Sequence, residues 1–235
     1  IGVPPKHVVK KLHDNNILVA NMIGAPKHVK KALDVGADIL ICQGTEGGGH
    51  TGSIASSVLF PSVVSLVSKL NAKSPLTGDK IHVIGAGGIF DGRGLAMALN
   101  FGCEGIWVGT RFVASVESNA TLEHKKAIVK ARVSDTYTSE VYSGRPLRII
   151  KNEYADGWKK NEVKMKELLN KGIIPYKTDL NNPEKLKLIA ETYLSGQCAG
   201  NIHDILTADQ IIQQIMTQAI QVLRENTAKI TYIKS

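Results

Sequence analysis

The chain has 235 residues, of which 43% are hydrophobic and 21% charged, and this balance is typical of a globular protein without a membrane span. Its formal net charge of +8 comes from Lys and Arg scattered along the chain with few aromatic residues, which argues against a nucleic-acid partner or a membrane partner. The cysteines Cys42, Cys103 and Cys198 form no CxxC pair, so the sequence predicts reduced thiols, an intracellular, cytoplasmic protein and no metal site.

Residues 1–115 alternate between helix-like and strand-like segments. The predicted helices are 4–16, 25–36, 60–70 and 91–102, and the predicted strands are 17–24, 37–44, 80–88 and 103–112. The strands are nearly continuous apolar runs, as expected for parallel strands that are covered on both faces. Cys42 and Cys103 lie in such runs and are expected to be core residues.

The alternation stops near residue 115. From there the sequence predicts a helix at 120–133, an irregular turn-rich segment at 137–154, a helix at 159–171 and a loop at 173–185. Thr207 is a plausible N-cap for a last helix at 207–225. We therefore predict half of a βα barrel at 1–115, an inserted α-rich lid at 116–204 and a final helix at 205–235 that returns to the barrel.

The predicted fold class is α/β, and specifically the C-terminal part of a TIM (β/α)8 barrel. Four strands form half of such a barrel, and the start at Ile1 suggests that N-terminal strands are absent from this sequence. The alternative is a doubly wound sheet. The barrel is favoured because glycine-rich segments follow successive strands, and barrel active sites lie at the carboxyl ends of the strands.

Two of these glycine-rich segments are typical of phosphate binding. "GAGGIFDGRG" at 85–94 offers bare backbone N–H groups at Gly87 and Gly88, with the N-terminus of a helix to assist them. "WVGTRF" at 107–112 adds Gly109 and the hydroxyl group of Thr110. No Walker lysine and no dinucleotide fingerprint accompanies them.

Five motifs together carry a family resemblance: "ICQGTEGGGHTG", "VIGAGGIFDGRGLAMAL", "GIWVGTRF", "SGRPLR" and "SGQCAGNI". They resemble the nitronate monooxygenase (2-nitropropane dioxygenase) family of FMN-dependent barrel enzymes, which also includes a flavin-containing enoyl-acyl carrier protein reductase. The resemblance extends from residue 1 to about 225. It departs at Gly47, where the family usually has Ala, and in the absence of the N-terminal barrel strands.

The resemblance implies a role for nine residues. His50 matches the family's catalytic base, and a neutral imidazole can accept a proton near neutral pH. The implied flavin contacts are Gln43, Gly48, Gly87, Gly88, Trp107, Val108, Gly109 and Thr110, of which Trp107 and Val108 contribute backbone. The alternative for His50 is a structural histidine bonded to a loop carbonyl. The six other histidines are expected to be non-catalytic, and the roles of Glu46, Gln197 and Cys198 stay open.

The predicted function is an FMN-dependent oxidoreductase that oxidises alkyl nitronates, and also neutral nitroalkanes, with O₂. Its partners are thus FMN, a small-molecule substrate and oxygen. The alternative within the fold is an enoyl-acyl carrier protein reductase that uses NAD(P)H. A purine-nucleotide dehydrogenase barrel would need a cysteine in a loop after a strand, where this chain has His50. A non-catalytic binding barrel would need no His50.

Overall fold

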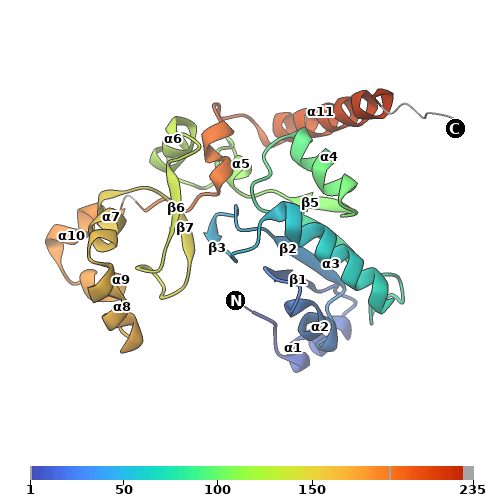
Figure 1. Cartoon of the computed structure of the whole chain (residues 1–235), viewed down its shortest axis with the longest axis horizontal. Helices are drawn as coiled ribbons and strands as arrows, with labels where there is room; N and C mark the ends of the chain where they lie inside the picture. The colour runs from blue at the N-terminus through green and yellow to red at the C-terminus, as the bar shows by residue number, and fades with distance from the viewer. Residues whose placement is uncertain (1, 191, 230–235) are drawn as a thin grey trace, which may run out of the picture. The chain divides into compact units, whose positions relative to one another are not determined.

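The computed structural model describes residues 2–190 and 192–229, which form two compact units (Figure 1). Unit 1 contains the described residues of 1–45, 52–108 and 207–235, and unit 2 contains those of 46–51 and 109–206. The sequence-based division placed 46–51 and 109–115 with the barrel, whereas these units group both segments with the inserted region. Each unit is described by itself.

Unit 1 is built on a parallel sheet. Its strands are β1 (Ala20–Ile23), β2 (Ile39–Gln43), β4 (His82–Ala86) and β5 (Gly105–Trp107), in the order β1-β2-β4-β5. Between them run the helices α2 (His28–Asp34), α3 (Ser56–Leu70) and α4 (Gly92–Asn100), while α1 (Lys6–His13) precedes β1. The strand order follows the chain without a reversal, which matches a barrel better than a doubly wound sheet, because right-handed crossovers in one direction place all the helices on one face.

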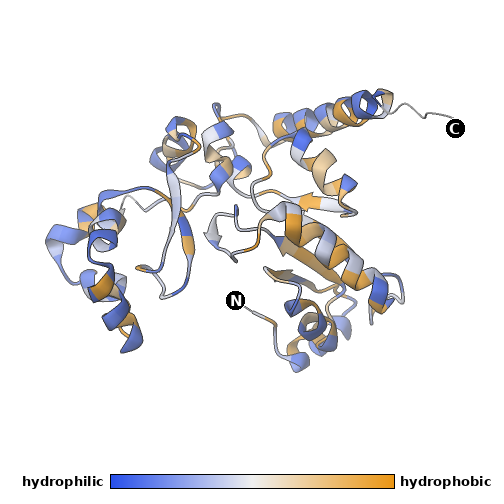
Figure 2. Cartoon of the chain, in the orientation of Figure 1, coloured by the Kyte–Doolittle hydropathy of each residue, from blue (hydrophilic) through white to orange (hydrophobic). Residues whose placement is uncertain are grey.

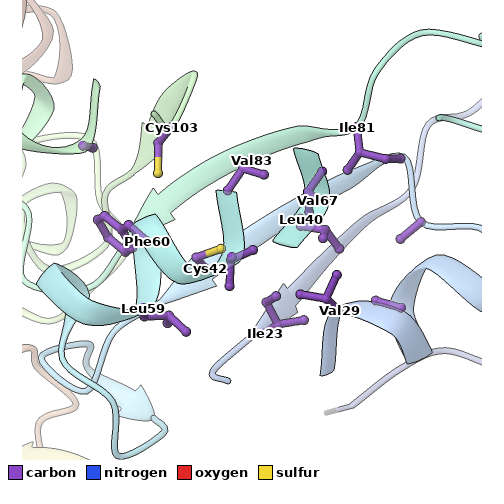
Figure 3. Packing of buried hydrophobic residues seen from close by; sticks show 14 of the residues in the cluster. Ile23, Val29, Leu40, Cys42, Leu59, Phe60, Val67, Ile81, Val83 and Cys103 are labelled. Atoms are coloured by element: carbon purple, nitrogen blue, oxygen red, sulfur yellow. The ribbon is translucent and has the colours of Figure 1, made fainter. Parts of the chain in front are cut away.

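The core of unit 1 lies between the helices and the sheet. Leu59 and Phe60 of α3 are fully buried in one apolar cluster with Cys42 of β2 and Val83 of β4 (Figure 3). Figure 2 shows β2 and α3 among the more hydrophobic segments of the chain. Cys42 and Cys103 are 0% and 3% exposed, and burial raises the pKa of the Cys103 thiol to about 11. Both cysteines are therefore core residues, as predicted.

The last helix, α11 (Ala208–Ala228), packs against α4 within unit 1 (Figure 1). The predicted N-cap is confirmed: the Thr207 hydroxyl accepts from the backbone N–H of Gln210, and the Gln210 side chain accepts from the backbone N–H of Thr207. Gly92 lets the two helices approach closely, because a Cβ there would meet the backbone of Ile215 and Ala219.

A buried carboxylate lies at the other end of the sheet, where the strands begin. Asp38 is 1% exposed and accepts hydrogen bonds from the Ser74 hydroxyl at 2.6 Å and the Val19 N–H at 2.7 Å. Ser74 bonds to Oδ1, whereas the Val19 N–H shares Oδ2 with His13 Nε2, which lies 2.8 Å from that oxygen. Asp38 therefore ties α1, the start of β1 and the loop after α3 to the start of β2.

Unit 2 contains an antiparallel sheet that the sequence analysis missed. It consists of β3 (Gly49–His50), β7 (Leu147–Ile150) and β6 (Thr136–Ser139), in the order β3-β7-β6. The helices of the unit are α5 (Thr110–Val113), α6 (Leu122–Lys130), α7 (Glu153–Lys160), α8 (Glu162–Asn170), α9 (Pro175–Asp179), α10 (Pro183–Ala190) and the 3-10 helix η1 (Gln197–Asn201).

Two expectations for this region were thus wrong. The segment 137–154 is a hairpin followed by a helix, and the predicted loop 173–185 contains α9 and the start of α10. Strands and helices of four to eight residues are too short to show a clear hydrophobic period, and the Gly and Pro residues around them read as turns. In the described part of the chain, no helix is both long enough and apolar enough to cross a bilayer.

Candidate active site

At the carboxyl edge of the unit 1 sheet, Gln43 ends β2 and Gly87 and Gly88 follow β4. The Gly44 N–H donates to the Ala86 carbonyl at 2.9 Å, which joins the two strand ends. Gly87 and Gly88 have φ angles of +94° and +74°, a left-handed conformation that side chains with a Cβ rarely adopt. The backbone conformation therefore explains why both positions are glycine.

The same turn leaves backbone donors available. Among residues 2–190 and 192–229, no acceptor takes a hydrogen bond from the N–H of Gly87 or Gly88. The expectation that the N-terminus of α4 assists anion binding was wrong. The Asp91 carboxylate already accepts from the N–H groups of Arg93 and Gly94, and the Gln218 side chain accepts from the Gly92 N–H. An anion would therefore meet the N–H groups of the turn and not those of α4.

Trp107 ends β5 and Val108 follows it, and the two side chains have different environments. Val108 packs against the core cluster, whereas Trp107 is 56% exposed. The Trp107 side chain is therefore not part of the core of unit 1.

In unit 2, Gly109 and Thr110 begin the short helix α5. A Cβ on Gly109 would meet nothing within 4 Å, and the Gly109 N–H has no acceptor in the described ranges. The Thr110 hydroxyl is nearly buried and accepts from the Gly196 N–H at 2.9 Å. The hydroxyl thus already accepts one hydrogen bond within the protein, and the Cys198 thiol is a second hydrogen-bond neighbour.

Residues 46–51, here called the histidine loop, are held by unit 2 on two sides. On one side β3 pairs with β7, with Gly49 opposite Arg148 and His50 opposite Leu147. On the other side the Gln197 N–H donates to the Glu46 carbonyl at 2.9 Å. Gly48 lies against the same segment: a Cβ there would be 2.6 Å from the backbone nitrogen of Gly196. Close packing of protein backbone thus explains Gly48 without a flavin.

The His50 side chain has one defined partner. Its Nε2 atom lies 2.8 Å from the Ser143 hydroxyl oxygen, which is also 3.3 Å from the Arg145 carbonyl oxygen. Burial and then the positive charge of Arg145 lower the pKa of His50 below its ordinary value. The imidazole is therefore neutral at pH 7, the state in which it can accept a proton.

The structure gives surroundings for Cys198 and Glu46, whose roles the sequence left open. Cys198 is buried and its pKa is raised to about 11 by burial, against a weaker lowering by the Thr110 hydroxyl, so it is a poor nucleophile. Glu46 interacts electrostatically with the buried Arg148.

Ser143 was missed as a site residue because it lies 93 positions from His50. The quoted motif "SGRPLR" was the available signal, since it contains both Ser143 and Arg145.

Three other histidines have structural partners: His13 with Asp38, His82 with Glu104, and His124 with the Leu194 carbonyl. In the residues that the structure describes, no group of three or more His, Cys, Asp or Glu side chains could hold a metal ion. These three imidazoles therefore have structural roles.

Comparison with known proteins identifies the family. The family model described as nitronate monooxygenase matches residues 1–218. A putative monooxygenase of Mycobacterium tuberculosis is 29% identical over 94% of this chain and 58% of its own length. In the same organism, (3aS,4S,5R,7aS)-5-hydroxy-7a-methyl-1-oxo-octahydro-1H-indene-4-carboxyl-CoA dehydrogenase is 38% identical over 65% of this chain and 41% of its own length. The chain thus spans about half the length of the curated relatives that it matches.

Comparison with a solved structure supports an α/β fold of the barrel type. The structure of FabK from Thermotoga maritima superposes with a TM-score of 0.79 at 29% identity, covering 96% of this chain and 68% of that one. The chain therefore has an α/β fold that resembles the matched part of FabK. From the matched family model we conclude that the chain belongs to the nitronate monooxygenase family.

Proposed function

We propose that this chain is the C-terminal part of an FMN-dependent barrel enzyme that oxidises alkyl nitronates, and neutral nitroalkanes after deprotonation, with O₂. The observation that carries the proposal is His50: a partly buried, neutral imidazole held in place by Ser143 on the loop where the family resemblance expects a base. Residues 116–204 are proposed to act as the lid.

The backbone fits a flavin phosphate. Gly87 and Gly88 of unit 1 and Gly109 of unit 2 carry N–H groups without acceptors in the described residues, and the space where Gly109 would bear a Cβ is open. Such groups bind phosphate oxygens well. We propose these three residues and Thr110 for the phosphate, with Gln43, Gly48, Trp107 and Val108 as further flavin contacts.

In the proposed reaction, the neutral His50 imidazole takes the proton on the carbon that bears the nitro group. The C–H electron pair moves into the carbon–nitrogen double bond of the nitronate, and the proton stays on the imidazole. FMN, when bound, supplies the electron acceptor that passes electrons from the nitronate to O₂. The chain contributes the base, its orientation and the binding of the cofactor.

The substrate form separates a base from a merely structural histidine. A neutral nitroalkane must lose a proton, whereas a nitronate has already lost it. General-base catalysis contributes about 10²–10⁴-fold, so His50→Asn should lower kcat/KM by that factor on the nitroalkane and far less on the nitronate. His7→Asn, at an exposed position of α1, is the control. Equal losses on the two substrates would mean that His50 is not the base.

A second candidate is an enoyl-thioester reductase that uses NAD(P)H. The relative whose name gives a carboxyl-CoA substrate supports a thioester ligand in this family. The assay that separates the candidates is NADH or NADPH consumption with an enoyl thioester, run beside oxygen consumption with a nitronate. Flavin absorbance of the purified protein tests the cofactor that both candidates need.

A further inference from the structure

The motif at 143–148 supplies Ser143, the partner of the proposed base, and it contacts the histidine loop at several points. β7 pairs with β3, and the Thr51 N–H donates to the Pro146 carbonyl at 3.4 Å. Ser143 lies at the turn before β7 and reaches the His50 ring itself. The backbone of the loop and the side chain of its histidine are thus fixed by one hairpin.

The hydrogen bonds of Ser143 select one arrangement of protons. Its hydroxyl oxygen lies 2.8 Å from His50 Nε2 and 3.3 Å from the Arg145 carbonyl oxygen. A carbonyl can only accept, and a hydroxyl has one proton to give. Both contacts are hydrogen bonds only if Ser143 donates to the carbonyl and accepts from a proton on Nε2. If Ser143 donated to Nε2 instead, the carbonyl would lose its donor.

A proton on Nε2 leaves the lone pair of the neutral ring on Nδ1. Within the described ranges, Nδ1 of His50 has no hydrogen-bond partner, so that lone pair is available to a substrate proton. The imidazole would then be a base through Nδ1, and Ser143 would hold the ring so that Nδ1 keeps one direction.

We propose that Ser143 is a positioning residue for His50, which keeps the proton of the neutral ring on Nε2 and makes Nδ1 the atom that accepts the substrate proton. This inference rests on the proposed function for the identity of that proton. When Nδ1 takes the proton, the ring becomes an imidazolium whose Nε2–H still donates to Ser143, so the hydrogen bond is kept through the step.

The first test needs no turnover. In the purified protein labelled with 15N-histidine, the ring-nitrogen signals of His50, assigned by their loss in His50→Asn, tell which nitrogen carries the proton at neutral pH. We expect Nε2–H in the wild type and in Ser143→Thr, which keeps the hydroxyl, and a mixture of both forms in Ser143→Ala. A proton on Nδ1 in the wild type, or an unchanged form in Ser143→Ala, would overturn the inference.

The second test uses the substrate forms. Ser143→Ala should lower kcat on a neutral nitroalkane about 3- to 10-fold, the effect of one net hydrogen bond, and leave nitronate turnover within about twofold. Ser143→Thr should restore the rate, and Ser139→Ala on β6 of the same hairpin is the control for general disturbance. Equal losses on both substrates would contradict a positioning role in proton abstraction.

The two proposals fail in different ways. Absence of nitroalkane and nitronate turnover in the flavin-loaded wild type would contradict the proposed function, whatever the nitrogen signals show. Normal turnover with the His50 proton on Nδ1 would contradict the role of Ser143 alone.

Discussion

Gly109 is the glycine at which a bound ligand can be distinguished from backbone strain. At Gly87 and Gly88 the positive φ angles make any substitution costly by itself, and at Gly48 a Cβ would collide with the backbone of Gly196. Gly109 has a negative φ of −105° and open space around the missing Cβ. A methyl group there therefore meets a ligand or nothing.

Gly109→Ala should fold as the wild type does and bind FMN about tenfold more weakly or worse, because the methyl group obstructs the approach of the phosphate to the N–H. The measurement is FMN affinity by fluorescence titration, with thermal unfolding to check the fold. Gly157→Ala is the matched control, since a Cβ on Gly157 in α7 also meets nothing within 4 Å. Equal FMN affinities in the two variants would remove Gly109 from the site.

The pH dependence of turnover should report the environment of His50. Burial and the charge of Arg145 lower its pKa, so kcat/KM on a neutral nitroalkane should rise with pH and level off at a pKa below the ordinary 6.5. Arg145→Gln removes the repulsion of the imidazolium and should move this inflection to higher pH. The nitronate profile should lack the inflection. A nitroalkane rate that falls as pH rises would contradict a neutral base.

Among the elements, those of unit 1 could be predicted from sequence and the sheet of unit 2 could not. The strands around Cys42 and Val83 are mostly apolar, and Thr207 has the chemistry of an N-cap, so these signals are local. In contrast, β3 is two residues long and exists because β7, almost a hundred residues later, pairs with it. Its formation depends on a distant partner, which no local pattern reveals.

The contact between α4 and α11 depends on the absence of a side chain at Gly92. Gly92→Ala would press a methyl group onto the Ile215 carbonyl and the Ala219 backbone, and it should lower the free energy of unfolding by about 1–3 kcal/mol. Gly157→Ala in α7 is the control, because a Cβ on that helical glycine meets nothing within 4 Å. Chemical denaturation measures both. A Gly92→Ala protein that loses no more stability than Gly157→Ala would show that the helices separate at little cost.

At the scale of the molecule, stability and chemistry are expected at opposite ends of the unit 1 sheet. The proposed cofactor residues Gln43, Gly87 and Gly88 follow the ends of strands, whereas the Asp38 network lies where β1 and β2 begin. Glycines after apolar strands revealed the first end to sequence analysis. The second end was missed, because Asp38, His13 and Ser74 meet only in the folded chain.

The Asp38 network should make the fold sensitive to acid. Burial works to raise the pKa of Asp38, but hydrogen bonds from Ser74, Val19 and His13 together hold it below its usual value. The unfolded chain then binds the proton more readily, so the contribution of Asp38 is complete above about pH 4–5 and is lost as pH falls through the lower folded pKa. Asp38→Asn should lower stability at pH 7 by about 1–3 kcal/mol and flatten this acid loss.

The measurement is the free energy of unfolding from urea titrations at several pH values between about 3 and 7. This range brackets the pKa of an ordinary carboxyl group. Glu162→Gln, which removes an exposed partner of Lys166 on α8, is the control. An acid loss of the same size in Asp38→Asn and in the wild type would assign it to other carboxylates.

The histidine loop belongs to the same compact unit as residues 109–206, and this restricts where this protein can be recombined with its relatives. A chimera that takes 109–206 from a relative but keeps its own 46–51 would join a β3 strand, a Glu46 carbonyl and a His50 ring to partners that did not evolve beside them. Gly48 would also face a foreign backbone in place of Gly196. Crossovers should therefore carry both segments together, so that the proposed base travels with the hairpin that holds it.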